Sequence, residues 1–128
     1  MARYDKYDNL AGGFRAPLNA DLAKTSAGNP LGVGLNTSGR VVVGAGNTGV
    51  VGVICLTRDM KAGDIVDVMT AGEVVDCGSL VAGTVYTANT TTGVLTNGAA
   101  SATQTPIGYT VEATRLVVRR STNPFIGT

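Results

Sequence analysis

The sequence predicts a small all-β protein, and three observations support this prediction. Residues 32–76 form a series of short runs rich in Val and Ile, each ended by a turn that contains Gly or Asn. β-Branched side chains suit a pleated, half-buried surface, and Gly and Asn supply the backbone conformations of tight turns. The runs follow one another too closely for helices to lie between them. A compact antiparallel sheet or small β-barrel is therefore expected.

The composition limits the function as well as the fold. Aromatic residues make up only 5% of the 128 residues and Trp is missing, so Val, Leu, Ile and Ala must fill the core. Ten basic and nine acidic residues leave a net charge of +1, which gives no general attraction to nucleic acid or membranes. The uncharged residues 41–57 are short for a membrane helix and are interrupted by glycines. The charged start of the chain lacks the apolar run of a signal peptide, which indicates a soluble protein made in a cytosol.

Residues 1–31 differ from the rest and are expected to form an extended N-terminal arm. They combine three of the six Tyr and Phe side chains with Gly12, Gly13, Pro17 and Pro30, and they show no sustained period. Aromatic residues and Arg are enriched where proteins contact each other, so this segment is suited to lie along another surface. The alternatives are a disordered leader and a strand that pairs back onto its own domain.

Residues 32–119 are expected to form the folded domain, and residues 120–128 an extended C-terminal tail. Residues 50–56 are the most apolar run and are predicted to form the most central strand. A hairpin is expected to join residues 64–69 to residues 73–76. Further strands are predicted at residues 33–35, 40–43, 84–88, 94–96, 106–112 and 115–119.

A weak internal repeat runs through this domain. Residues 33–53 and residues 86–109 both contain a strand, a turn with Asn, a second strand, a polar loop and a strand with a central Gly. This pattern suggests a pseudo-duplicated barrel.

Residues 44–49 (GAGNTG) match the Gly-x-Gly-x-x-Gly pattern of dinucleotide-binding loops, and Asp64 or Asp67 lies near the spacing of a ribose ligand. Such a site needs a helix directly after the glycines, because the helix N-terminus holds the pyrophosphate. The following run, VVGVIC, is β-branched with a Gly in its middle, which disfavours a helix. A turn is therefore expected here.

The residue inventory argues against an enzyme, a metal site and a bound cofactor. His is missing, which removes the commonest general base and a frequent metal ligand. Asp64 and Asp67 are three residues apart, so a strand would place them on opposite faces. Cys55 and Cys77 have no neighbouring zinc-binding pattern, and Cys55 is expected to be a buried free thiol.

Positive charge gathers near the end of the chain. The residues concerned are Arg115, Arg119 and Arg120. A solvated strand edge that discourages aggregation explains such charges, and a secondary contact with an acidic partner surface is the alternative.

A larger pattern connects the motifs of the body. Residues 61–76 (KAGDIVDVMTAGEVVD) contain an AGD…V…GEV core, and AGTVYTA, TGVL, PIGYTVEA and LVVR follow between residues 82 and 119. Together these motifs resemble the small capsid decoration (cement) proteins of tailed bacteriophages. The opening YDKYD…GGFRAP of residues 4–17 is similar to the leader of such proteins in phages of actinobacteria.

This resemblance implies a β-barrel-like or β-tulip-like domain on the outer surface of a phage head. Such proteins bind the major capsid protein after the shell expands, commonly as homotrimers, and an N-terminal arm can add to strands of the shell. Carried onto this chain, the capsid-binding residues would be Arg3, Tyr4, Tyr7, Phe14 and Arg15. The protein would be a virion component without enzymatic activity, made in the host cytoplasm, that stabilises the expanded head.

Two other functions are compatible with parts of the sequence. A phage tail-tube or fibre subunit belongs to the same structural class and would polymerise by itself. A small nucleotide-binding domain would depend on residues 44–49.

Overall fold

The computed structural model describes residues 12–24, 30–75, 77–78 and 80–119. Within these residues the chain forms ten β-strands and no helix. The strands are β1 (Gly13–Pro17), β2 (Leu31–Leu35), β3 (Val41–Val43), β4 (Gly52–Ile54), β5 (Ile65–Met69), β6 (Ala71–Val74), β7 (Val85–Asn89), β8 (Leu95–Asn97), β9 (Gln104–Thr110) and β10 (Leu116–Arg119). The all-β prediction is confirmed.

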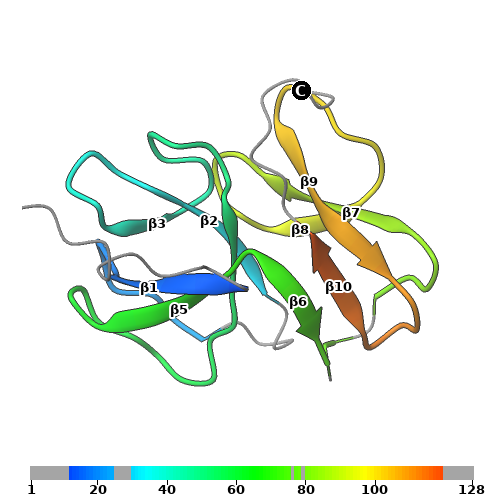
Figure 1. Ribbon diagram of the computed structural model, residues 1–128, viewed down its shortest axis with the longest axis horizontal. Coiled ribbons are helices and arrows are strands. Elements are labelled where there is room, and N and C mark those ends of the chain that lie inside the picture. Colours follow the sequence, from blue (N-terminus) through cyan, green and yellow to red (C-terminus); the bar gives the residue numbers. More distant parts are fainter. Residues whose placement is uncertain (1–11, 25–29, 76, 79, 120–128) are drawn as a thin grey trace, which may run out of the picture.

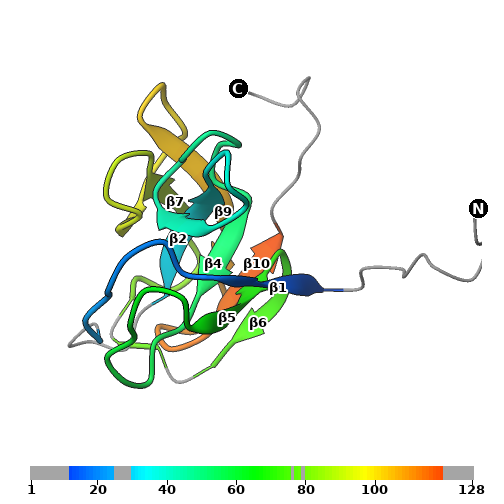
Figure 2. The same ribbon diagram turned by 90° about the vertical axis from the view of Figure 1, so that its left-hand side faces the viewer.

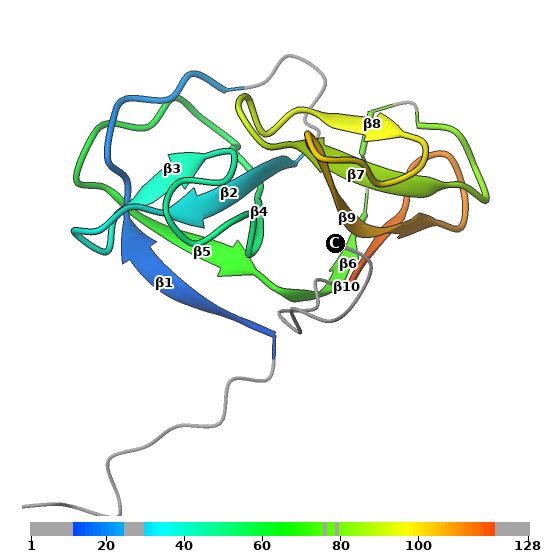
Figure 3. The same ribbon diagram turned by 90° about the horizontal axis from the view of Figure 1, so that it is seen from above.

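Two antiparallel five-stranded sheets lie side by side (Figure 1, Figure 3). The first has the strand order β1-β5-β4-β2-β3 and the second the order β6-β10-β9-β7-β8. Neither sheet closes on itself. The fold is therefore a pair of open sheets, and the closed barrel that the sequence suggested is not formed. β4 occupies the centre of the first sheet and all three of its residues are buried, which confirms the predicted central strand.

The two sheets repeat one topology. When β6 to β10 are matched in order to β1 to β5, the two strand orders are identical. The matched hairpins β2–β3 and β7–β8 each turn beside an Asn whose side chain accepts two backbone hydrogen bonds. Asn36 Oδ1 accepts hydrogen bonds from the N–H groups of Ser38 and Arg40, and Asn89 Oδ1 accepts them from those of Thr91 and Thr92. The internal repeat is confirmed at the level of strand order.

The hairpin expected between residues 64–69 and 73–76 is wrong. β5 pairs with β1 and β4, whereas β6 pairs with β10 in the other sheet. Only Thr70 separates β5 from β6, so the chain passes from one sheet to the next without reversing its direction (Figure 1). β1 occupies one edge of β5 along its whole length, and β4 pairs with the other edge at Met69, the end that continues toward β6, so a hairpin partner has no place there.

The apolar side chains form two clusters, one for each sheet. Leu18, Val33, Ile54 and Val68 belong to the first, and Tyr86, Ile107, Leu116 and Val118 to the second. Val50 and Val53, from the first half of the chain, are buried in the second cluster. The second core is therefore completed by residues of the first half.

Glycines let the two sheets meet closely. The N–H of Gly32 donates to the carbonyl of Gly93 at 2.8 Å, and the N–H of Gly44 donates to the carbonyl of Gly32 at 2.9 Å. A Cβ on Gly93 would overlap that carbonyl oxygen of Gly32. Only residues without a side chain allow this backbone contact.

The described part of the expected arm is packed on the domain. β1 pairs with β5 along its whole length, Leu18 is fully buried, and Leu22 exchanges backbone hydrogen bonds with Met60 (Figure 2). For residues 13–17 the alternative, a strand that pairs back onto its own domain, is therefore the observed one. Residues 1–11 and 25–29 of the expected arm lie outside the described residues.

Candidate functional site

One edge of β5 is open along most of its length. On the other edge, β1 is paired with all five residues of β5. Leu18 N–H donates to the carbonyl of Asp64 and Thr70 N–H to that of Gly12, which fixes the alternation of the ladder. In an antiparallel ladder, Val66 and Val68 then bond to β1, while Ile65, Asp67 and Met69 direct their backbone groups the other way.

β4 covers only one end of this second edge. The ladder between β4 and β5 consists of a single register pair, Val53 with Met69. In the matching place of the second sheet, β9 and β10 are paired at three positions. The backbone therefore separates after Val53, and Ile65 and Asp67 face a gap where a regular ladder would continue.

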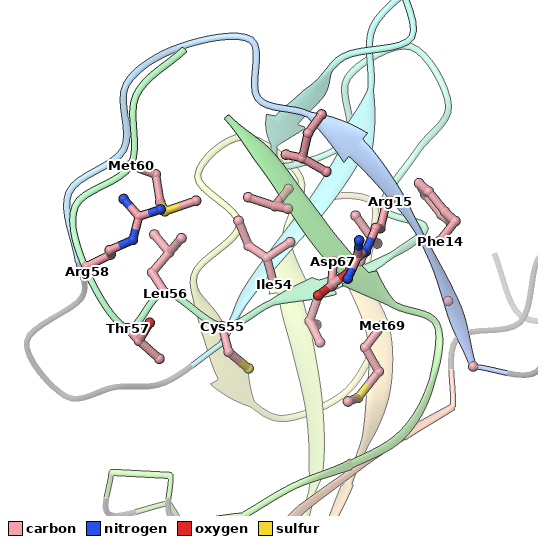
Figure 4. A pocket seen from close by; sticks show the side chains of 16 residues that line it. Phe14, Arg15, Ile54, Cys55, Leu56, Thr57, Arg58, Met60, Asp67 and Met69 are labelled. Atoms are coloured by element: carbon pink, nitrogen blue, oxygen red, sulfur yellow. The ribbon is translucent and has the colours of Figure 1, made fainter. Parts of the chain in front are cut away.

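A groove of about 730 Å³ occupies this gap. Figure 4 shows Leu56, Thr57, Arg58 and Met60 on one side of it and Phe14, Arg15 and Asp67 on the other. The lining consists of Gly12, Gly13, Phe14, Arg15, Ile65, Val66, Asp67, Val68 and Met69 from β1, the residue before it and β5, and of Val53, Ile54, Cys55, Leu56, Thr57, Arg58 and Met60 from β4 and the segment after it.

The groove is apolar inside and charged at its rim. Ile54, Leu56, Val66 and Val68 are buried in the first core, so the floor is rigid and hydrophobic. Ile65 is 57% exposed and adds an apolar side chain to the lining of the groove. An apolar groove beside an unpaired strand edge is suited to bind an extended peptide.

An exposed ion pair marks one side of the rim. Arg15 Nε donates to Asp67 Oδ1 at 2.7 Å, and both side chains are 76% exposed. Asp67 thus lies in a solvent-facing row on β5. At such exposure the pair contributes little to stability, so these groups can change partners at low cost.

Cys55 lines the groove and is exposed. The prediction that Cys55 is a buried thiol is therefore wrong, and the buried cysteine is Cys77. The reason is that β4 ends at Ile54 and the chain then turns away from β5. Although Cys55 is exposed, the surrounding groups desolvate its sulfur, and this burial, followed by the charge of Cys77, raises the pKa of Cys55. The Cys55 thiol is accessible but stays protonated to higher pH than an ordinary cysteine.

The structure brings together two of the five predicted capsid-binding residues. Phe14 and Arg15 both lie on β1 and both line the groove. Phe14 also packs against the first core, so part of its role is structural. Arg3, Tyr4 and Tyr7 lie outside the described residues, as does Arg120.

Of the three arginines of the predicted secondary contact, the structure describes Arg115 and Arg119. Arg115 binds Glu112 through two hydrogen bonds, of 2.7 and 3.0 Å, and Glu73 through a third of 3.0 Å. Glu112, and then Glu73, raise the pKa of Arg115, and their carboxylates neutralise its charge. Arg119 is exposed at the end of β10. Arg115 therefore joins β6, β10 and the turn before β10, and offers no free charge to a partner.

A second apolar surface lies on the outer face of the second sheet. Val85, Tyr109 and Val117 stand opposite one another in the ladders β7–β9 and β9–β10. Val85 is 51% exposed and Tyr109 43%. The Arg115 ion pairs lie beside this stripe, because Glu73 stands opposite Val117 in the ladder between β6 and β10.

The glycine motif at residues 44–49 forms turns, as predicted. After Gly49 the chain continues through the buried Val50 into β4, so no helix N-terminus stands behind these glycines. Among the described residues, no group of three or more His, Cys, Asp or Glu side chains could hold a metal ion. No helix in the described part of the chain is long and apolar enough to cross a membrane.

Sequence reasoning did not find the groove. It identified Phe14 and Arg15 from their residue types, but it gave β5 the wrong neighbour. The groove depends on where the pairing of β4 with β5 stops, and no residue pattern in either strand indicates that point.

Comparison with solved structures gives a likeness of fold. No family model and no curated protein matches the sequence. A solved chain described as "Mycobacterium phage Patience" matches the structure with a TM-score of 0.72 and 19% sequence identity, over 93% of this chain and 96% of that one. At this identity the likeness shows that the two chains share a fold across nearly their whole lengths.

Proposed function

We propose that this protein is a structural component of a bacteriophage particle that binds the outer surface of the capsid shell and stabilises the expanded head. The observation that supports it best is the likeness, over 93% of this chain, to a chain from Mycobacterium phage Patience. The decoration-protein motifs of residues 61–119 point to the same class. In this proposal the partner is the major capsid protein, the protein acts as a homotrimer, and it has no enzymatic activity.

The groove and the residues before it supply a surface for this function. Phe14 and Arg15 join the groove to residues 1–11, which contain the other three predicted contacts, Arg3, Tyr4 and Tyr7. Aromatic and Arg side chains around an apolar groove are typical of binding surfaces. The surface is repeated in each copy, so weak contacts can add up on a symmetric shell.

A reconstitution experiment tests the proposal. Particles of the phage that encodes this chain are prepared without it, and purified protein is added back. We expect the protein to sediment with expanded shells and to raise the temperature at which they break. Protein that stays in the supernatant at all concentrations would refute the proposal.

Two arginine variants show which surface is used. Arg15→Ala removes an exposed ion pair and should leave the fold intact, while weakening shell binding by ~1–2 kcal/mol, the loss typical of an interface Arg. Arg119→Ala is the matched comparison, because Arg119 is also an exposed strand residue but lies on the other sheet, and a loss of binding there would support the secondary contact instead. Equal binding by the wild type and Arg15→Ala would remove Arg15 from the contact.

The tail-tube or fibre alternative predicts a different result with the purified protein alone. Size-exclusion chromatography should then show long polymers without any shell. Small oligomers in that experiment support the decoration function.

A further inference from the structure

We infer that the groove beside β5 binds residues 1–11 of a second copy of this chain as an added β-strand. This inference goes beyond the proposed function, because it concerns how copies join each other and requires no shell. It rests on the open backbone edge of β5, on the repeated topology and on the chain that precedes Gly12.

The groove offers the hydrogen-bonding groups that an added strand needs. Ile65 and Asp67 each direct one N–H and one C=O into it, because Val66 and Val68 use theirs for β1. On the far side, Cys55 and Thr57 belong to the segment that has separated from β5. An extended peptide lying between them would extend the sheet along β5.

The second sheet acts as an internal reference for this site. There β9 and β10, the counterparts of β4 and β5, remain paired at Gly108, Tyr109 and Thr110. The same topology therefore allows these two strands to pair at three positions, whereas β4 and β5 of the first sheet pair at only one. An open edge inside a sheet is otherwise a liability, because unpaired backbone groups attract other chains.

Residues 1–11 are long enough to reach the groove of another copy. Gly12 and Gly13 line its end beside Met69, so the chain that precedes Gly12 joins the domain next to this site. Eleven extended residues span roughly 36–40 Å, and a five-residue strand needs only about 17 Å. The remaining six residues can bridge the distance between two neighbouring molecules.

The composition of this segment also fits the groove. Tyr4 and Tyr7 favour strands, and Leu10 adds an apolar side chain. The rim carries mixed charge, because Arg15 is paired with Asp67 and Arg58 lies 4.0 Å from Asp64. The segment is mixed as well, with Asp5 and Asp8 beside Arg3 and Lys6, so exposed ion pairs can be exchanged between the two. Backbone pairing leaves alternate side chains of an added strand pointing outward. The same segment can therefore link two copies and still contact a shell.

Cys55 provides a native reporter, because it is exposed and lines the groove. The full chain is treated with iodoacetamide over a range of protein concentrations, and alkylation of Cys55 is followed by mass spectrometry. We expect the rate to fall at least three-fold as the concentration rises. A synthetic peptide of residues 1–11 added to dilute protein should give the same protection. The same peptide with N-methylated backbone at alternate residues should not.

A crosslink identifies the origin of the strand. Oxidation of a Tyr4→Cys variant should join the introduced thiol to Cys55 of another copy and give covalent multimers on a denaturing gel. The same variant with Cys55→Ser added is the control: its single introduced thiol can link two chains at most, so it should give no multimer larger than a dimer. A disulfide within one chain would show that the segment folds back onto its own domain and would overturn the inference.

Two variants of β5 test whether backbone pairing is responsible. Ile65→Pro removes an N–H that faces the groove and no bond to β1, and Ile65→Thr is the matched control that keeps the N–H. Concentration-dependent protection of Cys55 should be lost in the first and kept in the second. Protection that is unchanged in Ile65→Pro, or equal with both peptides, would refute strand addition. Full reactivity of Cys55 at every concentration, with and without peptide, would refute binding at the groove altogether.

Discussion

Gly93 and Gly39 adopt nearly the same backbone conformation in different surroundings. Their φ angles are +73° and +77°, both in the left-handed region. A Cβ on Gly93 would collide with the carbonyl of Gly32, whereas a Cβ on Gly39 would meet nothing within 4 Å. The two positions therefore separate the cost of a left-handed residue from the cost of close packing between the sheets.

We predict that Gly39→Ala lowers the free energy of unfolding by about 1–2 kcal/mol, the cost of the left-handed conformation. Gly93→Ala should cost roughly 2 kcal/mol more, because the methyl group also forces the sheets apart. Urea denaturation measures both. Equal losses would show that the contact between Gly32 and Gly93 relaxes without strain.

The thiol of Cys55 makes a prediction about pH. Its pKa is raised in the folded protein, so folding opposes its ionisation. Stability should therefore be constant below the pKa of the unfolded thiol and fall as the pH rises from there through the higher folded pKa. Cys55→Ser should remove this alkaline loss, as measured by urea denaturation across the range in which thiols ionise, roughly pH 7 to pH 10. An unchanged pH profile in Cys55→Ser would assign the loss to other groups.

Among the secondary-structure elements, β1 and the residues after it belong to the domain. Leu18 is fully buried, while Leu22 is only half-buried. We predict that Leu18→Ala costs about 3 kcal/mol of stability, as expected for a core leucine, and that Leu22→Ala costs roughly half as much. Thermal denaturation of both variants tests this. A small effect of Leu18→Ala would mean that the segment after β1 is not part of the folded core.

β5 should show an alternating pattern of amide exchange. In dilute protein, the amides of Val66 and Val68 are bonded to β1 and should exchange slowly, while those of Ile65 and Asp67 face the groove and should exchange quickly. Hydrogen exchange followed by NMR resolves the four amides. Uniform slow exchange along β5 would show that the groove edge is already paired.

In the molecule as a whole, the two sheets are expected to unfold together. Val50 and Val53 complete the core of the second sheet, and backbone bonds from Gly32 and Ala45 tie the first sheet to the β7–β8 turn. We predict one calorimetric transition with equal calorimetric and van't Hoff enthalpies. Two separate transitions would instead indicate that each repeated half is an independent folding unit.

The fold class and the local turns of this protein could be predicted from its residues alone. β-Branched runs separated by Gly and Asn specify strands and hairpins, and the turns at Asn36 and Asn89 formed where they were expected. These features depend on neighbouring residues, whose conformational preferences are local. The same patterns revealed the internal repeat, and the residue types of Phe14 and Arg15 indicated a binding surface.

The choice of strand neighbours, in contrast, was made by the packing of the folded chain. The sequence predicted a hairpin of β5 with β6, but β5 received β1 and β4 as partners, and the pairing with β4 stopped after Val53. Strand partners far apart in the chain are selected by packing over the whole core, and side-chain patterns do not record that selection. The groove, the exposed Cys55 and the open edge of β5 all follow from it.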